Sequence, residues 1–518
     1  MKQRLLLGAL GVVGCVIAAP VLAQGTVAGI LAADWDTLDP HKTRTTHGFQ
    51  MAMALYDRVV ALDSDGNVIP YLAESWVAGP DSVTMTIRSG ATCTDGTPLD
   101  AAAVAANLTR EADPDAGIAL RTRTFGAGPA TITHDDAAQT VSIQLAQPNG
   151  DMMLSLAMAW SSIICPAGLA DPDALQGTPQ GSGPFTLTDS RRGDIYVMSR
   201  RNDHAWGPDL GELPGRLPDT FTLRVSPNAT TSANLFLTNE VNIVSLQGRD
   251  IERLATESGL GRIDMTLFGT DGMMMSRMPD RITSEQAVRR ALAHAVDREG
   301  FKRAFAFGFG EVVNTLTTPS MQCYDAEAGA NVPVYDPSLS EALLAEAGFA
   351  RNASGIWERD GEPLRIRIIG HGGQNAGPEF LMESWRAIGI DASLVMNDFG
   401  GWFETYQANT DWDVTIHPHN STLPSPSLFV AAFTGAPQPG GGNYIGAENP
   451  RYVAATSAAL AAGPDERCAL WAEAQRVLID DLDTFPLVAR VASTFTRGVG
   501  ASMAAGTVVK PLSLRLLD

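Results

Sequence analysis

Residues 59–110 constrain the fold of this chain more than any other stretch. The segment begins with apolar residues and reaches an Asp-Ser-Asp-Gly turn signal at residues 63–66. Val83, Met85 and Ile87 then alternate with small or polar residues, which predicts a strand with one buried face. Asp100 stands in the N-cap position before the alanine-rich residues 101–110, which predicts a helix. Taken alone, these pieces predict an ordinary hairpin followed by a helix.

The size and composition of the chain predict a globular protein with two or three lobes. It has 518 residues, of which 45% are apolar and 18% are charged. The formal net charge of −21 argues against nucleic acid or an anionic membrane surface as a partner. It does not identify a cationic ligand, because a diffuse negative surface usually serves solubility.

The N-terminus has the pattern of a secretory signal. Lys2 and Arg4 precede the apolar residues 5–19, a run that is short for a membrane span. Residues 21–23, Val-Leu-Ala, place small residues before a cut at Gln24. We therefore expect a signal peptide over residues 1–23 and a mature protein in the periplasm.

A lipid anchor is the alternative at this end of the chain. Residues 12–15, Val-Val-Gly-Cys, form a weak lipobox that would make Cys15 a lipidated terminus. Residues 16–23 stay apolar where a lipoprotein usually turns polar, and this favours soluble export. No second stretch approaches the roughly 20 apolar residues of a membrane helix.

Several segments, taken in order, resemble one protein family. Residues 72–76 read LAESW, residues 87–90 read IRSG and residues 95–104 read DGTPLDAAAV. Residues 286–298 read QAVRRALAHAVDR, and residues 335–349 read YDPSLSEALLAEAGF. This order resembles the extracytoplasmic solute-binding proteins of family 5, which serve peptide, nickel and opine ABC importers. The resemblance covers nearly all of the chain after the signal.

The resemblance implies an α/β fold of the type II periplasmic-binding-protein kind, in which two lobes close on a ligand like a Venus flytrap, with a small inserted lobe. It places the main lobe at residues 24–60, 178–268 and 486–518, the small lobe at 61–177 and the second lobe at 269–485. It implies a monomer that captures a peptide or peptide-like solute and delivers it to an ABC permease in the inner membrane. No cofactor is expected.

Two further expectations concern side chains in these lobes. Val288, Ala291, Leu292 and Ala295 share one helical face and are expected to pack in the second lobe, whereas His294 lies outside that face and is expected to meet solvent. Asp336 is expected to cap a helix that has Pro337 in its first turn.

Cleavage before Gln24 leaves four cysteines, which allow three complete pairings. Cys93 and Cys165 fall in the same inferred lobe, so this pair is favoured in an oxidising compartment. Buried free thiols remain the alternative, also for Cys323 and Cys468. The absence of a C-x-x-C spacing argues against a zinc site or a redox motif.

The sequence displays no catalytic motif. It lacks a G-x-S-x-G elbow, an H-E-x-x-H helix, a Walker loop and a Rossmann glycine set. We therefore expect a binding protein and no enzyme. A secreted hydrolase is the rival from another class, and it would require a nucleophile–base pair that the sequence does not display.

One wall of the ligand cleft is expected from the first half of the chain. Thr45 and His47 follow the first strand, where the family's chain leaves toward the ligand; a helix N-cap with a solvated face is the alternative. Arg121 and Arg123 lie two apart in an expected extended loop, so both would point the same way and suit a carboxylate. Plain surface charge is the alternative for the two arginines.

The other wall is expected from Trp402, Trp412 and the loop of residues 417–426. His417 and His419 would face one side of an extended backbone and are able to bind a metal or a metal chelate. Histidines bonded to backbone or water are the alternative reading.

Residues 417–426 lack an acidic side chain, although peptide-binding relatives usually hold the peptide ammonium with an Asp there. Asn420 is the nearest replacement, and a neutral amide cannot supply an ion pair. We therefore expect a ligand whose anchored end is anionic or neutral. A peptide-like solute, a nickel chelate, an opine and a sugar conjugate all remain open.

Overall fold

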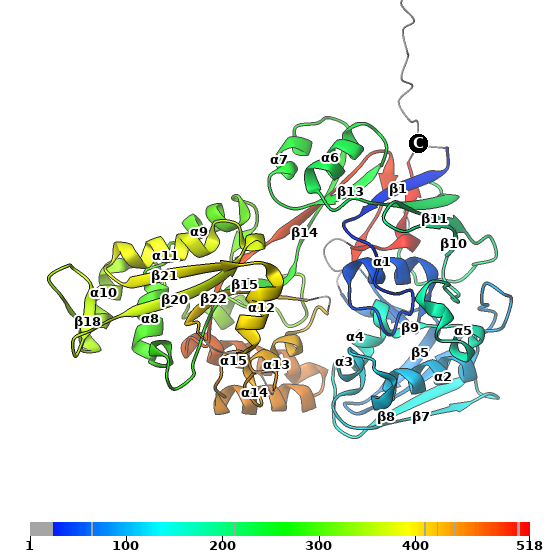
Figure 1. Ribbon diagram of the computed structural model, residues 1–518. Helices are drawn as coiled ribbons and strands as arrows, with labels where there is room; N and C mark the ends of the chain where they lie inside the picture. Colours follow the sequence, from blue (N-terminus) through cyan, green and yellow to red (C-terminus); the bar gives the residue numbers. More distant parts are fainter. Residues whose placement is uncertain are drawn as a thin grey trace, which may run out of the picture.

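The computed structural model describes residues 24–63, 66–211, 213–408, 411–421, 423–438, 441–504 and 508–517. Its strands and helices are arranged in two bodies that are joined by a pair of long strands (Figure 1). One body holds the N-terminal half and the C-terminal segment, and the other holds residues from about 268 to 488. The expected α/β class is confirmed.

The main lobe is built on a four-stranded sheet whose N-terminal strand pairs in parallel with a strand almost 200 residues later. The sheet order is β1 (Thr26–Leu31), β12 (Thr220–Val225), β11 (Ile195–Arg200) and β10 (Phe185–Arg191). Its core contains Leu31, Phe49, Tyr196 and Phe221. The helices of this part are α1 (Thr46–Leu55), α5 (Pro166–Ala170), α6 (Ala229–Leu237) and α7 (Asp250–Ala255).

The small lobe contains the segment from which the sequence argument began. Val83, Met85 and Ile87 are buried on β6 (Ser82–Ile87) as expected, and the Asp100 side chain accepts a hydrogen bond from the Ala103 amide at the start of α2 (Ala101–Ala112). The antiparallel sheet runs in the order β5 (Ala73–Ala78), β6 (Ser82–Ile87), β8 (Thr140–Leu145) and β7 (Ala130–Asp135). The helices are α2 (Ala101–Ala112), α3 (Arg121–Phe125) and α4 (Met152–Leu156).

The second lobe is built on a six-stranded mixed sheet. The order is β16 (Glu311–Val312), β23 (Thr484–Ala489), β15 (Phe268–Met275), β22 (Val414–Ser421), β20 (Arg365–His371) and β21 (Asp391–Asn397). The helices around it are α8 (Gln286–His294), α9 (Arg298–Ala306), α10 (Pro337–Glu346), α11 (Gly377–Ala387), α12 (Phe399–Ala408), α13 (Val430–Phe433), α14 (Pro450–Ala461) and α15 (Pro464–Asp480).

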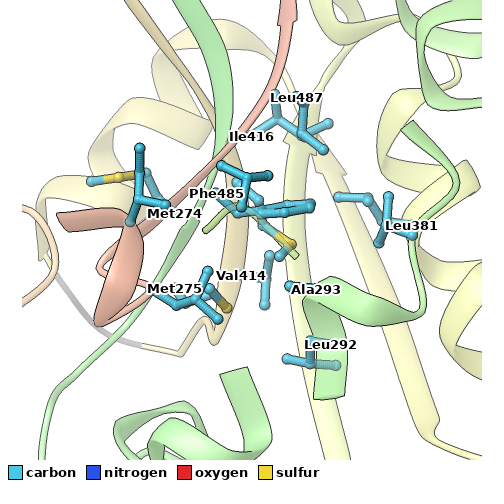
Figure 2. Packing of buried hydrophobic residues seen from close by; sticks show 14 of the residues in the cluster. Met274, Met275, Leu292, Ala293, Leu381, Val414, Ile416, Phe485 and Leu487 are labelled. Atoms are coloured by element: carbon cyan, nitrogen blue, oxygen red, sulfur yellow. The ribbon is translucent and has the colours of Figure 1, made fainter. Parts of the chain in front are cut away.

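Side chains from three neighbouring strands and two helices meet in the core of this lobe. Figure 2 shows Met275 of β15, Val414 of β22 and Phe485 of β23 beside Leu292 of α8 and Leu381 of α11. All five are essentially inaccessible to solvent. Burying apolar side chains of this size stabilises a fold by about 1.5–3 kcal/mol each, so this cluster holds helices and sheet together.

Two chain crossings connect the bodies. β14 (Gly261–Thr266) leads through Leu267 into β15, and β23 leads through Arg490 into β24 (Val491–Thr496). β24 lies between β13 (Ile243–Leu246) and β14 in a separate three-stranded sheet. The Leu267 amide donates to the Arg490 carbonyl at 2.9 Å, so the two crossings are bonded to each other where they pass between the bodies (Figure 1).

The remaining strands are short. They are β2 (Asp57–Arg58) with β9 (Ser162–Ile163), β3 (Val60–Leu62) with β4 (Val68–Pro70), β17 (Ala350–Arg351) with β18 (Trp357–Arg359) and β19 (Glu362–Pro363), β25 (Val499–Gly500) with β28 (Arg515–Leu516), and β26 (Met503–Ala504) with β27 (Val508–Val509).

Two disulfides lie within the described residues. Cys93 bonds to Cys165, which confirms the favoured pair, and Cys323 bonds to Cys468. The first ties the small lobe together, and the second fixes the segment before α10 to α15. In the ranges that the structure describes, no helix is both long and apolar enough to cross a membrane. Residues 1–23, with the expected signal peptide and Cys15, lie outside these ranges.

Helix α8 confirms one expectation and corrects another. Val288, Ala291, Leu292 and Ala295 are all buried, as predicted. His294, which was expected to meet solvent, is only 5% exposed, and its Nδ1 lies 2.8 Å from the carbonyl oxygen of Val334. The segment before α10 covers this end of α8, a contact that helical periodicity does not report. Asp336 caps α10 as expected, accepting from the Leu339 amide.

The hydrophobic cores do not divide at the residues where the sequence places the lobe boundaries. Leu154, Trp160 and Leu175 fall in the range 61–177 but pack in the main-lobe core. Leu487 and Val488 fall after residue 486 but pack in the second-lobe core. The division into a main lobe, a small lobe and a second lobe at the stated residues remains a proposal.

Candidate functional site

A cavity of about 580 Å³ lies where the main lobe, the small lobe and the second lobe meet. Phe49 and Met53 of α1 contribute one side, and residues 157–160 contribute the adjoining side. Phe268 and Pro424 enter from the second lobe. The volume falls in the range typical of small-molecule sites, which are largely apolar with a few polar groups that fix orientation. The cavity is therefore the candidate ligand site.

The aromatic wall of the cavity is held in place from behind. Trp160 and Phe49 meet edge to face with ring centroids 5.9 Å apart. The Trp160 Nε1 donates to the Thr124 hydroxyl at 3.3 Å, and that hydroxyl donates to the Glu111 carboxyl at 2.8 Å. Burial raises the pKa of Glu111 to about 7, although the Ser161 and Thr124 hydroxyls act in the opposite direction. This network fixes the ring orientation of a residue that lines the site.

Two cations and one carboxylate are the charged side chains that line the cavity within the described residues. They are Arg58, Lys510 and Asp63. Asp63 accepts hydrogen bonds from the Asn67 amide and side chain at 2.9 and 3.0 Å. The Lys510 ammonium donates to the carbonyl oxygens of Leu62 and Asp63. The part of the lining that the structure describes therefore carries more positive than negative charge.

The small lobe and the second lobe touch through Asp151, which is only 1% exposed. Its carboxylate pairs with Arg467 of α15 and accepts hydrogen bonds from the hydroxyls of Ser425 and Ser427. Arg467 also donates to the carbonyl oxygen of Gly150 at 2.6 Å. These four side chains, Asp151, Ser425, Ser427 and Arg467, form what we call the interlobe bridge. In a second contact between the two lobes, the side-chain amide of Gln322 donates a hydrogen bond to the carbonyl oxygen of Gly66.

The structure places Thr45 and His47 at the start of α1. Thr45 is the N-cap of the helix, accepting from the Gly48 amide, and its hydroxyl donates to Asp36 at 3.0 Å. This is the capping alternative that the sequence left open. His47 is half-buried, and burial lowers its pKa more than the nearby Asp36 and Asp34 raise it. Neither residue lines the cavity.

The two predicted arginines do not act as a pair. They lie in helix α3, so their side chains leave the backbone in different directions, whereas an extended loop was expected. Arg121 is buried and donates to the carbonyl oxygens of Ala112, Gly126 and Gly128, so it holds the fold of its own segment. The Arg123 guanidinium forms no hydrogen bond or ion pair within the described residues, and burial lowers its pKa. It remains a candidate, although it does not line the cavity.

Trp402 and Trp412 are buried inside the second lobe, which corrects the expectation that their rings form a wall of the cleft. Both are at most 2% exposed, and they pack with Tyr406 and Ile369. The Trp402 Nε1 donates to the Thr415 hydroxyl at 2.9 Å. Phe399, at the start of α12, is instead 61% exposed beside Trp402.

His417 and His419 lie on β22, so the expected ligand loop begins later in the chain than predicted. Their rings face the same side, with centroids 5.0 Å apart, as an extended backbone requires. The His419 Nε2 lies 3.0 Å from the Thr484 hydroxyl, whereas the His417 Nδ1 is buried without a hydrogen-bond partner. Burial lowers the pKa of His417 to about 4 and holds the pKa of His419 well below its ordinary value, so both rings are neutral near pH 7.

The structure describes only the backbone of Asn420, which pairs with Gly269. Its predicted side-chain role therefore lies outside the described part of the chain. Among the described residues, no group of three or more His, Cys, Asp or Glu side chains is placed to hold a metal ion.

The cavity residues that sequence reasoning missed come from distant segments. Phe49, Arg58, Trp160 and Lys510 span most of the chain, and none stands in a motif. Arg58 directly follows a buried aspartate inside an otherwise apolar stretch, and this unusual setting is the one signal that points to it.

Comparisons with known proteins agree on a family. The sequence model of the bacterial extracellular solute-binding proteins, family 5 (middle part), matches residues 67–441. The nickel-binding periplasmic protein of Escherichia coli K12 is 28% identical over 376 residues, covering 69% of this chain and 68% of that protein. The glutathione-binding protein GsiB of Salmonella paratyphi A is 27% identical over 404 residues, covering 76% and 74%.

One solved structure is similar to this chain in both fold and sequence. It is a substrate-binding protein from Microbacterium hydrocarbonoxydans complexed with 4-hydroxybenzoate hydrazide. It superposes with a TM-score of 0.75 at 28% identity, over 95% of this chain and 100% of that one. The expected two-lobed periplasmic-binding fold is thereby confirmed, and the chain belongs to the family 5 bacterial extracellular solute-binding proteins.

Proposed function

We propose that this protein is the substrate-binding component of an ABC import system and that it captures a small peptide-like solute in the cavity between its lobes. The observation that carries the proposal is the 580 Å³ cavity, whose wall is assembled from three separate hydrophobic cores. A ligand in such a place contacts both bodies at once, so it favours the conformation in which they are close together.

The two chain crossings support a hinge. Leu267 and Arg490 are the single residues between consecutive strands at these crossings, and their backbones are bonded to each other. Beside them, Arg490 pairs with the buried carboxylate of Asp271 at 2.7 Å. A small change in backbone angles at these two positions would rotate one body against the other while both cores stay intact.

Export and delivery complete the proposal. One relative is a nickel-binding periplasmic protein, and residues 1–23 have the pattern of a signal peptide. The mature protein acts in the periplasm as a monomer, performs no catalysis itself and docks its ligand-bound form on a permease of the inner membrane.

A change in shape upon binding tests this function. Small-angle scattering should show a smaller radius of gyration when ligand recovered from cells is added to stripped protein. An unchanged scattering curve with a ligand whose binding calorimetry has established would overturn the closing mechanism. Turnover of ester or peptide substrates would overturn the assignment as a binding protein.

A nickel chelate is the second candidate ligand, and one observation favours it. His417 is a neutral imidazole with an unbonded buried nitrogen, next to a second histidine, and one relative is nickel-binding. Metal analysis of gently purified protein distinguishes the candidates: stoichiometric nickel that is lost in His417→Ala supports the chelate, and metal-free protein with a bound organic solute excludes it.

A further inference from the structure

Arg58 is a buried cation that no anion of the described part of the chain bonds. Its side chain lines the cavity, and the whole residue is only 5% exposed. Its guanidinium lies over the Tyr71 ring at 5.6 Å, but within the described residues it forms no hydrogen bond or ion pair, and Nη1 is buried without a partner. An arginine does not lose its proton in proteins, so the charge persists. Burying an unpaired charge is costly, which makes this arrangement unfavourable in the absence of a ligand.

Lys510 places a second positive charge nearby. Its ammonium has three donors, and the carbonyl oxygens of Leu62 and Asp63 use two of them at 3.1 and 3.2 Å. Burial lowers the pKa of Lys510, the positive charge of Arg58 lowers it further, and Asp63 acts in the opposite direction. Both side chains line the same cavity, so the two cations are placed to act on one bound group.

Asp63 does not balance both charges. It is the one carboxylate among the described residues that line the cavity, and Asn67 already donates two hydrogen bonds to it. Among the described lining residues, one carboxylate against two cations leaves a net positive charge. A ligand ammonium would add to that charge, whereas an anionic group would offset it.

Most of the remaining lining is apolar. Phe49, Trp160, Phe268 and Met503 present rings and a thioether, and the remaining neighbours are mainly aliphatic residues and proline. The body of a bound molecule therefore meets apolar surface once its charged end is placed at the cations.

We infer that the cavity takes a small organic carboxylate with an aromatic or branched aliphatic body, and that Arg58 and Lys510 hold its carboxylate. The inference rests on the proposed function and specifies the chemical class of the solute. It assigns Arg58 and Lys510 to the recognition of charge, and Phe49 and Trp160 to the recognition of the apolar body.

Three probe ligands that share one carbon skeleton separate the effect of the ligand's charge from that of its shape. They are 3-phenylpropanoate, its neutral amide 3-phenylpropanamide, and L-phenylalanine, which adds an ammonium to the same acid. Calorimetry on ligand-stripped protein should show that the anion binds at least about tenfold more tightly than either of the others. A charged hydrogen bond in a closed site typically contributes about 10- to 150-fold in affinity.

Substitutions in the protein then show which residues cause the preference for the anion. Arg58→Met and Lys510→Met should each weaken binding of the anion by about 10- to 150-fold while leaving the affinity for the amide within a few fold. Arg290→Met, which removes an exposed arginine on α8, is the matched control and should change neither affinity. Arg58→Met should also raise the melting temperature of the ligand-free protein, because it removes a buried charge that nothing offsets. A merely structural arginine would lower it.

Each result decides the inference. Equal affinities for anion and amide, tight binding of L-phenylalanine, or an anion preference that survives in Arg58→Met would overturn it. Failure of all three probes, together with recovery from cells of a neutral or cationic ligand, would overturn it too but leave the proposed function standing. Failure of the proposed function is a separate result: no bound solute from cells and no compaction with any candidate.

Discussion

The interlobe bridge makes a quantitative prediction about closure. Asp151 and the Arg467 side chain are 1% and 13% exposed where the small lobe meets the second lobe. Two unit charges about 3 Å apart attract each other by about 5 kcal/mol at an effective dielectric constant of 20. Opening the lobes returns both groups to water, which recovers part of this energy, so we expect a net contribution of about 2–3 kcal/mol to closure.

Replacing Asp151 by Asn should therefore weaken ligand binding by about 30- to 150-fold, because the open state gains population at the expense of the closed state. Calorimetry with ligand recovered from cells measures the affinity, and small-angle scattering measures the accompanying loss of compaction. A double-mutant cycle with Arg467→Met should show that the two substitutions are not additive.

Helix α15, which carries Arg467, also provides the control substitution. Arg476 of α15 pairs with Glu473, but their side chains are 38% and 53% exposed, so Arg476→Met should change the affinity by less than about fivefold. The reasoning is refuted if Asp151→Asn leaves both affinity and radius of gyration unchanged, or if the control variant has an equal effect.

Three further predictions test other parts of the molecule. Glu111 has a pKa of about 7 in the fold and 4.5 as a free side chain, so the native state binds more protons between these pH values. Its contribution to the free energy of unfolding should fall by up to about 3 kcal/mol as the pH rises from 4.5 to 7. Denaturant titrations should find this fall removed in Glu111→Gln; an unaltered pH profile would argue against the raised pKa. Removing the Cys93–Cys165 disulfide by a double Ser substitution opens a loop whose ends are 72 residues apart, which should cost about 4 kcal/mol of stability; a melting temperature equal to that of the wild type would contradict this. N-terminal sequencing of the exported protein should begin at Gln24 or find it cyclised, and a diacylated Cys15 would show lipidation instead.

Much of the local structure could be predicted because local chemistry determines it. Asp100 and Asp336 cap helices since their carboxylates accept from backbone amides within three residues, a relation visible in the sequence. The alternation of Val83, Met85 and Ile87 likewise reports one buried face of a strand. His294 was misplaced because a chain segment 40 residues later covers it.

The candidate site was harder to predict because distant parts of the chain build it. Aromatic size suggested Trp402 and Trp412, but their rings fill the interior of the second lobe and leave Phe399 at its surface. The spacing of Arg121 and Arg123 in an expected extended loop suggested Arg121, but the segment is helical and nearby carbonyl oxygens bind this side chain. The cations that reach the cavity, Arg58 and Lys510, are more than 400 residues apart, and only the folding of the chain brings them to one site.

Native mass spectrometry of protein taken gently from the periplasm tests the central claim most directly. The account predicts one small organic molecule bound to each chain of the wild-type protein. It also predicts that the molecule is absent from Ser320→Trp, which fills the cavity with a ring, and present in Ser354→Trp, which places the same ring on an exposed loop. A wild-type protein without any bound solute, or a solute that Ser320→Trp retains, would contradict the claim that this cavity captures the imported molecule.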